Sequence, residues 1–199
     1  TTLRAQGAVL EGGPRVLGVG NEGVGREVPA DQRGGYVPAS CLCEGPVIEL
    51  RHRETGAVLL AHEGDTLAGA DLTGAGLLYG NLAGMDLRGA DLRYADLCQA
   101  DLSGADFTGA TLLHADLTGS NLSRANFSTA RLADVRFLGA HVADTIFRGT
   151  DLTRTSWKLS WAESPPDFSE AHLGRAHLAH ATLPRARFTG ADLTEASLH

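Results

Sequence analysis

The chain has 199 residues, 43% of them hydrophobic, and a formal net charge of −7 at pH 7. It holds no apolar run of membrane length and no basic stripe with interleaved aromatic residues, so we expect neither membrane insertion nor direct nucleic-acid binding. These features predict a cytoplasmic protein.

Residues 1–46 are rich in glycine and proline and show no sustained hydrophobic period. Such a composition favours a flexible or loosely packed leader. Within it, Gly18 to Gly23 matches the glycine spacing of dinucleotide-binding loops. That motif needs a strand before it, a helix after it and a βαβ unit around it. The stretch that follows, residues 24–29, does not fit, and the sequence has no parallel-sheet pattern, so we expect no cofactor.

The three cysteines are Cys41, Cys43 and Cys98. An odd number without framework spacing does not predict a disulfide scaffold. Cys41 and Cys43 could be combined with His52 and His62 into a zinc site, but this spacing matches no familiar finger or ribbon. We therefore expect free thiols and no metal.

Residues 47–62 read as two short strands, 47–53 and 57–61, joined through Glu54-Thr55-Gly56. This pattern predicts a β-hairpin. Because it directly precedes the repeats described next, we expect it to cover the open edge of the first coil as an N-terminal cap.

Residues 63–199 are built on a five-residue spacing of apolar side chains. The row runs through Leu67, Leu72, Leu77, Leu82, Leu87, Leu92, Leu97, Leu102, Phe107, Leu112, Leu117, Leu122, Phe127, Leu132, Phe137, Val142, Phe147 and Leu152. A strand would place such residues on alternate faces, and a helix would rotate them by about 140° per repeat. Only a chain that turns one corner per five residues keeps the whole row inside, which predicts a solenoid.

The repeats read Ala-Asp-Leu-x-x, as in Ala90-Asp91-Leu92 and Ala100-Asp101-Leu102. About two-thirds of the chain thereby resembles the pentapeptide-repeat family. The resemblance implies an all-β fold, a right-handed quadrilateral β-helix in which four repeats make one coil and the central Leu or Phe points inward. The small residue two positions earlier leaves room for it, since overpacking costs about 1–3 kcal/mol.

A four-sided coil predicts that residues four repeats apart stack on one side. Phe107, Phe127 and Phe147 satisfy this spacing, and Trp157 also occupies a central position. The next central residue after Trp157 is Phe168, which indicates a one-residue bulge within 158–167. If so, Phe168 and Phe188 continue the phenylalanine column as part of the core.

The residue before the central position is acidic in the N-terminal coils. The members of this acidic belt are Asp86, Asp91, Asp96, Asp101, Asp106 and Asp116. Stacked carboxylates repel by about 1 kcal/mol per pair in water, so we do not expect the belt to stabilise the fold. Its simplest role is solubility, and the sharper hypothesis is a docking surface for a basic partner. Trp161, next to the bulge, either projects as a binding residue or folds over the coil to seal it.

No nucleophile elbow or catalytic constellation is present, so we predict a non-enzymatic protein-interaction scaffold. The alternative is a DNA-mimicking protein that binds DNA gyrase or topoisomerase IV and protects it from quinolones or peptide toxins, as the best-understood branch of the family does. The long leader, the acidic character confined to one end and the missing closing helix count against that alternative. We also expect a homodimer through the C-terminal coil.

Overall fold

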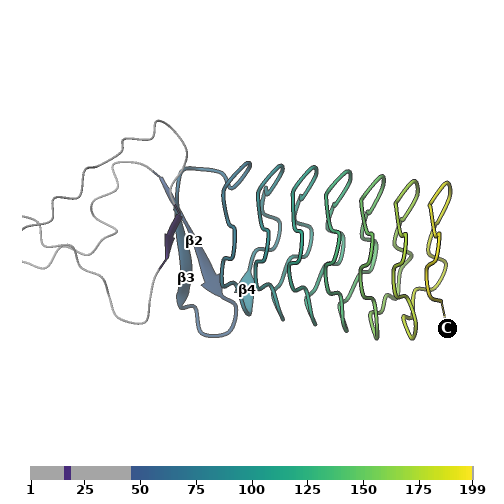
Figure 1. Cartoon of the computed structure of the whole chain (residues 1–199). Helices are drawn as coiled ribbons and strands as arrows, with labels where there is room; N and C mark the ends of the chain where they lie inside the picture. Colours follow the sequence, from purple (N-terminus) through teal and green to yellow (C-terminus); the bar gives the residue numbers. More distant parts are fainter. Residues whose placement is uncertain (1–15, 19–45, 199) are drawn as a thin grey trace, which may run out of the picture.

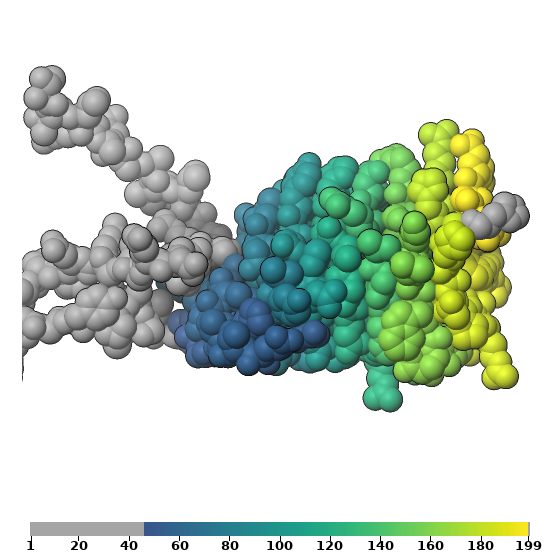
Figure 2. Space-filling view, turned by 90° about the horizontal axis from the view of Figure 1, so that it is seen from below, coloured from purple at the N-terminus to yellow at the C-terminus, as the bar shows by residue number. Residues whose placement is uncertain are grey.

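The computed structural model describes residues 16–18 and 46–198 (Figure 1). Four segments of this part form strands: β1 (Val16–Gly18), β2 (Val47–His52), β3 (Val58–Glu63) and β4 (Gly80–Asn81). They make one sheet in the order β1-β3-β2-β4, with every neighbouring pair antiparallel. The rest of residues 64–198 runs as stacked coils, and Figure 2 shows them as a continuous rod.

Single parallel bridges join each coil to the next, and each bridge links a residue to its counterpart four repeats later. The first set links Asp71 to Asp91, Gly76 to Asp96, Asn81 to Asp101 and Asp86 to Asp106. Four bridges per coil define four sides, which we number from the column of Asp71 (side 1) through those of Gly76 and Asn81 (sides 2 and 3) to that of Asp86 (side 4). The two residues after each central position form the corner between sides.

Backbone hydrogen bonds explain why the coils stack. At the first side, Leu72 N donates to Asp91 O at 2.7 Å, while Asp91 N donates to Ala70 O at 2.9 Å. Each corner closes within the coil, as when Ala75 N donates to Leu72 O at 3.0 Å. Some backbone hydrogen bonds thus close the turns within a coil, and others join the coil to its neighbours. Together they give buried backbone groups partners, although few residues form strands.

Central side chains fill the interior. The phenylalanine rings of side 4 stack in parallel, with centroids 4.6 Å apart for Phe107 and Phe127, and 5.3 Å apart for Phe127 and Phe147. The column continues to Phe168 and Phe188 at 5.0 Å per step. The prediction that it survives the change of spacing is confirmed.

The bulge lies between the bridges His141–Trp161 and Ile146–Asp167. His141 and Trp161 are separated by the regular four repeats, whereas Ile146 and Asp167 are separated by four repeats plus one residue. Trp157 is fully buried, and its Nε1 donates a hydrogen bond to Thr155 Oγ1 at 2.8 Å. The next inward residue is Ala162, also buried. Ala162 is smaller than the residues at the other central positions, so the row of large apolar residues is interrupted here.

The hairpin of β2 and β3 lies at the N-terminal end of the coils (Figure 1). Leu50 and Leu60 pair across it and belong to the same apolar cluster as the coil interior. At the other end, Phe188 and Leu193 are only partly buried, and Leu198 is exposed. The leader, except for β1, and Cys41 and Cys43 lie outside the described residues.

Candidate interaction surface

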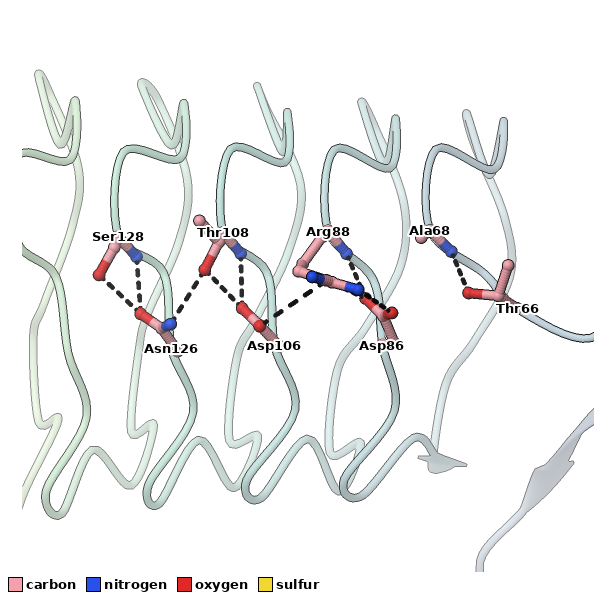
Figure 3. Close-up of polar contacts among 8 residues, drawn as sticks. All are labelled: Thr66, Ala68, Asp86, Arg88, Asp106, Thr108, Asn126 and Ser128. Atoms are coloured by element: carbon pink, nitrogen blue, oxygen red, sulfur yellow. Dashed lines mark hydrogen bonds and ion pairs between the residues drawn. The ribbon is translucent and has the colours of Figure 1, made fainter.

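Where the residue before the central position is Asp, Asn or Thr, its side chain often caps the following corner. Figure 3 shows four successive cases on side 4, in which a side-chain oxygen accepts a hydrogen bond from the backbone N–H two residues later. The donor–acceptor distances are 3.0 Å for Ala68 and Thr66, 3.2 Å for Arg88 and Asp86, 3.0 Å for Thr108 and Asp106, and 3.1 Å for Ser128 and Asn126. These are Asx turns and their hydroxyl equivalent.

These hydrogen bonds favour the fold and oppose the repulsion on which the expectation that the belt does not stabilise it was based. That expectation considered only repulsion between stacked carboxylates, whereas each carboxylate also satisfies a backbone donor. Asp91, Asp96, Asp101 and Asp116 accept the same bond, at 3.0–3.2 Å. The aspartates of the belt are part of the turn structure as well as of the surface.

The acidic belt encircles the rod and does not form one acidic face. The bridge columns place Asp91 on side 1, Asp96 and Asp116 on side 2, Asp101 on side 3, and Asp86 and Asp106 on side 4. A flat partner that contacts one side meets at most two members of the belt.

Arginine side chains neutralise part of the belt. Arg88 lies 2.7 Å from Asp86 and 4.0 Å from Asp106, and Arg93 lies 2.6 Å from Asp91. Arg136, one coil later on side 2, approaches Asp116 at 3.4 Å. The hydrogen bond from Arg88 lowers the pKa of Asp86 to about 2. Within residues 46–198, Asp96 and Asp101 are the two belt members without such an ion pair.

Trp161 projects from side 3 with 47% of its surface exposed. Its ring stacks on His141 of the preceding coil, with centroids 3.9 Å apart and an interplanar angle of 18°. His141 Nε2 lies 2.5 Å from a carboxylate oxygen of Glu163, so this nitrogen donates. That hydrogen bond holds the pKa of Glu163 below its ordinary value. Trp161 thus has a fixed platform beneath it.

The platform is braced by polar contacts that run along side 3. His141 Nδ1 lies 2.8 Å from Ser123 Oγ, and Ser123 Oγ donates to Asn121 Oδ1 at 2.6 Å. Asn121 Nδ2 then donates to Asp101 Oδ1 at 3.1 Å. The structure therefore connects Trp161 to the belt member Asp101 through neighbouring side chains, and these predicted site residues share one side.

A second row of contacting side chains, which the sequence analysis did not suggest, follows the corner between sides 1 and 2; we call it the corner ladder. Tyr94 stacks on His114 at 5.2 Å, His114 lies 3.9 Å from Asp134, and Arg154 donates to Asp134 at 2.7 Å. All four have φ between 57° and 62°, a region that usually favours glycine. Their regular spacing of four repeats was the signal that could have revealed the ladder.

Cys98 is a weak candidate for covalent chemistry. Its partial burial raises the pKa of the thiol to about 12, and neighbouring Asp96 and Asp116 act in the same direction. A thiol protonated at neutral pH is a poor nucleophile. Across the described ranges, no group of three His, Cys, Asp or Glu side chains is placed to hold a metal ion, and no helix has the length and apolarity needed to cross a membrane.

A rod of stacked four-sided coils with an apolar centre and Asx-capped corners is a repeat solenoid. The sequence profile described as "Pentapeptide repeats" matches eight copies, within residues 66–104, 86–124, 100–138 and 167–199. These segments cover more than half of the chain, which therefore belongs to the pentapeptide-repeat family.

Solved structures of the same family resemble the chain at low identity. The pentapeptide repeat protein Rfr23 from the cyanobacterium Cyanothece 51142 is 18% identical, with a TM-score of 0.42, over 60% of this chain and 91% of its own. QnrB1, a plasmid-mediated fluoroquinolone resistance protein, is 20% identical over 59% of this chain and 70% of its own, with a TM-score of 0.30. A pentapeptide repeat protein from the Arabidopsis thaliana thylakoid lumen is 23% identical over 60% and 69%, with a TM-score of 0.22. No curated protein matches the chain.

Proposed function

We propose that this protein is a non-enzymatic protein-interaction scaffold, which uses a right-handed quadrilateral β-helix to display oriented carboxylates to a basic partner. The proposal is carried by the fixed orientation of the Asp96 and Asp101 carboxylates and by their lack of a paired cation in the described part of the chain. Both are held in place by backbone hydrogen bonds at 3.0 Å and have no ion pair within residues 46–198. A preoriented, uncompensated carboxylate attracts a cationic group with little ordering cost.

Asparagine substitution separates charge from fold in this scaffold. Asn121 and Asn126 already cap their corners through Oδ1, as the aspartates do. Asp96→Asn with Asp101→Asn should therefore keep the coils and lower affinity for a basic partner. The matched control is Asp151→Asn with Asp192→Asn, which also removes two charges at the same repeat position, where Asp151 Oδ1 caps Thr153 N at 3.1 Å and Asp192 Oδ1 caps Thr194 N at 2.9 Å. Equal affinity of both variants would overturn the proposal.

A narrower proposal names a bacterial type II topoisomerase as the partner. It is supported by the net charge of −7 and by an acidic belt that encircles the rod, as the charges of duplex DNA do. The test is gyrase supercoiling and quinolone-induced DNA cleavage with the protein titrated in. Protection that is lost in Asp96→Asn, Asp101→Asn and Asp116→Asn combined supports mimicry. No effect at micromolar protein contradicts it.

We also propose a homodimer through the C-terminal coil, because the apolar side chains of Phe188, Leu193 and Leu198 are incompletely buried there. Exposed apolar surface of this kind favours association. Sedimentation should show a dimer at micromolar concentration that Leu198→Glu weakens. A strict monomer would rule out the dimer without affecting the scaffold proposal.

A further inference from the structure

Tyr94 is the most exposed of the Phe, Tyr and Trp side chains in residues 46–198, at 63% of its surface. One face of its ring is covered by His114 of the following coil, at 5.2 Å and an angle of 13°. The corner ladder of Tyr94, His114, Asp134 and Arg154 therefore begins at Tyr94. Whether the other face of the Tyr94 ring is covered depends on the residue that lies four repeats before Tyr94, in the preceding coil.

That position is Gly74, which has no side chain. A Cβ built on Gly74 would meet no atom within 4 Å, and the same holds for Gly76 at the start of side 2. Gly74 N donates to Arg93 O at 2.8 Å, so the coil itself is in place beneath Tyr94. The second face of the tyrosine ring thus looks toward Gly74, which presents only backbone.

Carboxylates flank this open corner. Asp71 precedes Gly74 on side 1, and Asp96 follows Tyr94 on side 2, bridged to Gly76. Each caps its own corner through Oδ1, at 3.1 Å for Asp71 and 3.0 Å for Asp96, and neither has an ion pair in the described part of the chain. The nearby Arg93 is paired with Asp91 at 2.6 Å. Three carboxylates and one guanidinium leave the corner negative.

The molecule already shows how a cation uses such a ring. Tyr79 is the equivalent tyrosine at the corner between sides 2 and 3, close to the hairpin. His52 stacks on Tyr79 at 5.2 Å, and the guanidinium carbon of Arg53 lies 5.5 Å from the ring centroid. Arg53 N also donates to Tyr79 O at 2.8 Å. The hairpin therefore places a guanidinium over the Tyr79 ring, and within residues 46–198 no guanidinium lies over the Tyr94 ring in this way.

We propose that Tyr94, Asp71 and Asp96 form an anchor for an arginine side chain on an extended basic segment of a partner protein. The guanidinium stacks on the open ring face, as Arg53 does on Tyr79, and its N–H groups donate to the two carboxylates. Arginine fits better than lysine because a planar cation stacks and donates at the same time. The inference rests on the scaffold proposal and names the chemistry of its partner.

The test uses the full chain and a capped tetra-arginine peptide, with the uncharged tetra-citrulline peptide as control. The sequence has three tyrosines, so selectively 13C-labelled tyrosine gives few ring signals, which single substitutions assign. The arginine peptide should shift the Tyr94 ring signals most, and tetra-citrulline should not. Tyr94→Leu should weaken binding about threefold, as an exposed cation–π contact implies. Leucine is accommodated in this backbone conformation at Leu159.

Asp96→Asn should weaken binding by a similar factor, while Asp192→Asn should not. Asp192 lies on side 1 at the other end of the rod and caps Thr194 N at 2.9 Å. Peptide binding that depends on Asp96 but leaves the Tyr94 signals and the Tyr94→Leu affinity unchanged would overturn the anchor and leave the scaffold proposal intact. Failure of the peptide to bind the chain at any site would overturn both.

Discussion

Trp161 and His141 are stacked one coil apart, with ring centroids 3.9 Å apart, and His141 also contacts Ser123 of the coil before it and Glu163 of the bulge. The sequence left open whether Trp161 projects or seals the bulge. It projects, with about half of its surface exposed. The imidazole supports one ring face, so the indole needs little ordering before it contacts a partner.

Trp161→Ala should therefore affect binding more than folding. An aromatic pair at the surface contributes about 0.5–1.5 kcal/mol to stability, whereas a tryptophan at the centre of an interface contributes about 2 kcal/mol or more to affinity. Urea denaturation and partner titration measure the two effects. Trp161→Phe, which retains stacking, is the matched control. If Trp161→Ala left the affinity for every identified partner unchanged, Trp161 would not belong to the binding site.

The phenylalanine column should be most sensitive in the middle of the rod. Phe127 is fully buried between Phe107 and Phe147, whereas Phe188 in the last coil is only partly buried. Phe127→Ala should cost about 3–5 kcal/mol of unfolding free energy, and Phe188→Ala distinctly less. Equilibrium urea denaturation gives both values. Equal costs would contradict a stack in which each coil depends on its two neighbours.

Leu50→Ala tests whether the hairpin caps the coils. The Leu50 side chain is fully buried, so its truncation should cost about 2–5 kcal/mol, against about 0.5 kcal/mol for exposed Val47→Ala. Hydrogen exchange adds the decisive readout. The amides of Leu72 and Leu77 in the first coil should lose protection before that of Leu173. Uniform loss along the rod would argue against a local capping role.

Acid should lower the stability contributed by the aspartates that pair with arginine. The ordinary pKa of Asp86 is 3.8, and the hydrogen bond from Arg88 lowers it to about 2 in the folded chain. Because the folded pKa lies below the unfolded one, the stabilisation is complete above pH 4 and is lost as pH falls through the folded value. The thermal midpoint should drop between about pH 4 and pH 2, and less steeply in Asp86→Asn.

NMR titration of the Asp86 carboxyl carbon provides the direct check. A midpoint near 2 agrees with the pairing to Arg88, and a midpoint near 3.8 shows that the pair does not persist in solution. Asp86→Asn keeps an oxygen acceptor for Arg88 N and removes only the titrating charge, so it isolates the ionic contribution from the turn.

The five-residue spacing was sufficient to predict the coils, because one inward residue per corner is a strict geometric requirement. It predicted the Phe147–Phe168 contact across the bulge for the same reason. Ala162 could not be recognised as a central residue, since it is smaller than the Leu, Phe, Val and Trp residues at the other central positions.

Some contacts between surface side chains could have been predicted from the sequence. His141 and Trp161, like Tyr94 and His114, are separated by four repeats, and this spacing places them in contact. The Asp86–Arg88 pair is a short-range contact that the sequence also contains. The contact between His141 and Glu163 could not have been predicted, because the two residues are more than four repeats apart and meet through the path of the chain in the bulge.

The bulge also bears on how such a rod can change over time. The regular spacing of four repeats returns after Asp167, with each column still on its own side, and the aromatic stack runs through without a gap. The extra residue is absorbed entirely at one corner. This corner is thus a place where the chain accepted an additional residue without breaking the aromatic stack, and a longer loop at the same corner would add a new contact element to the surface.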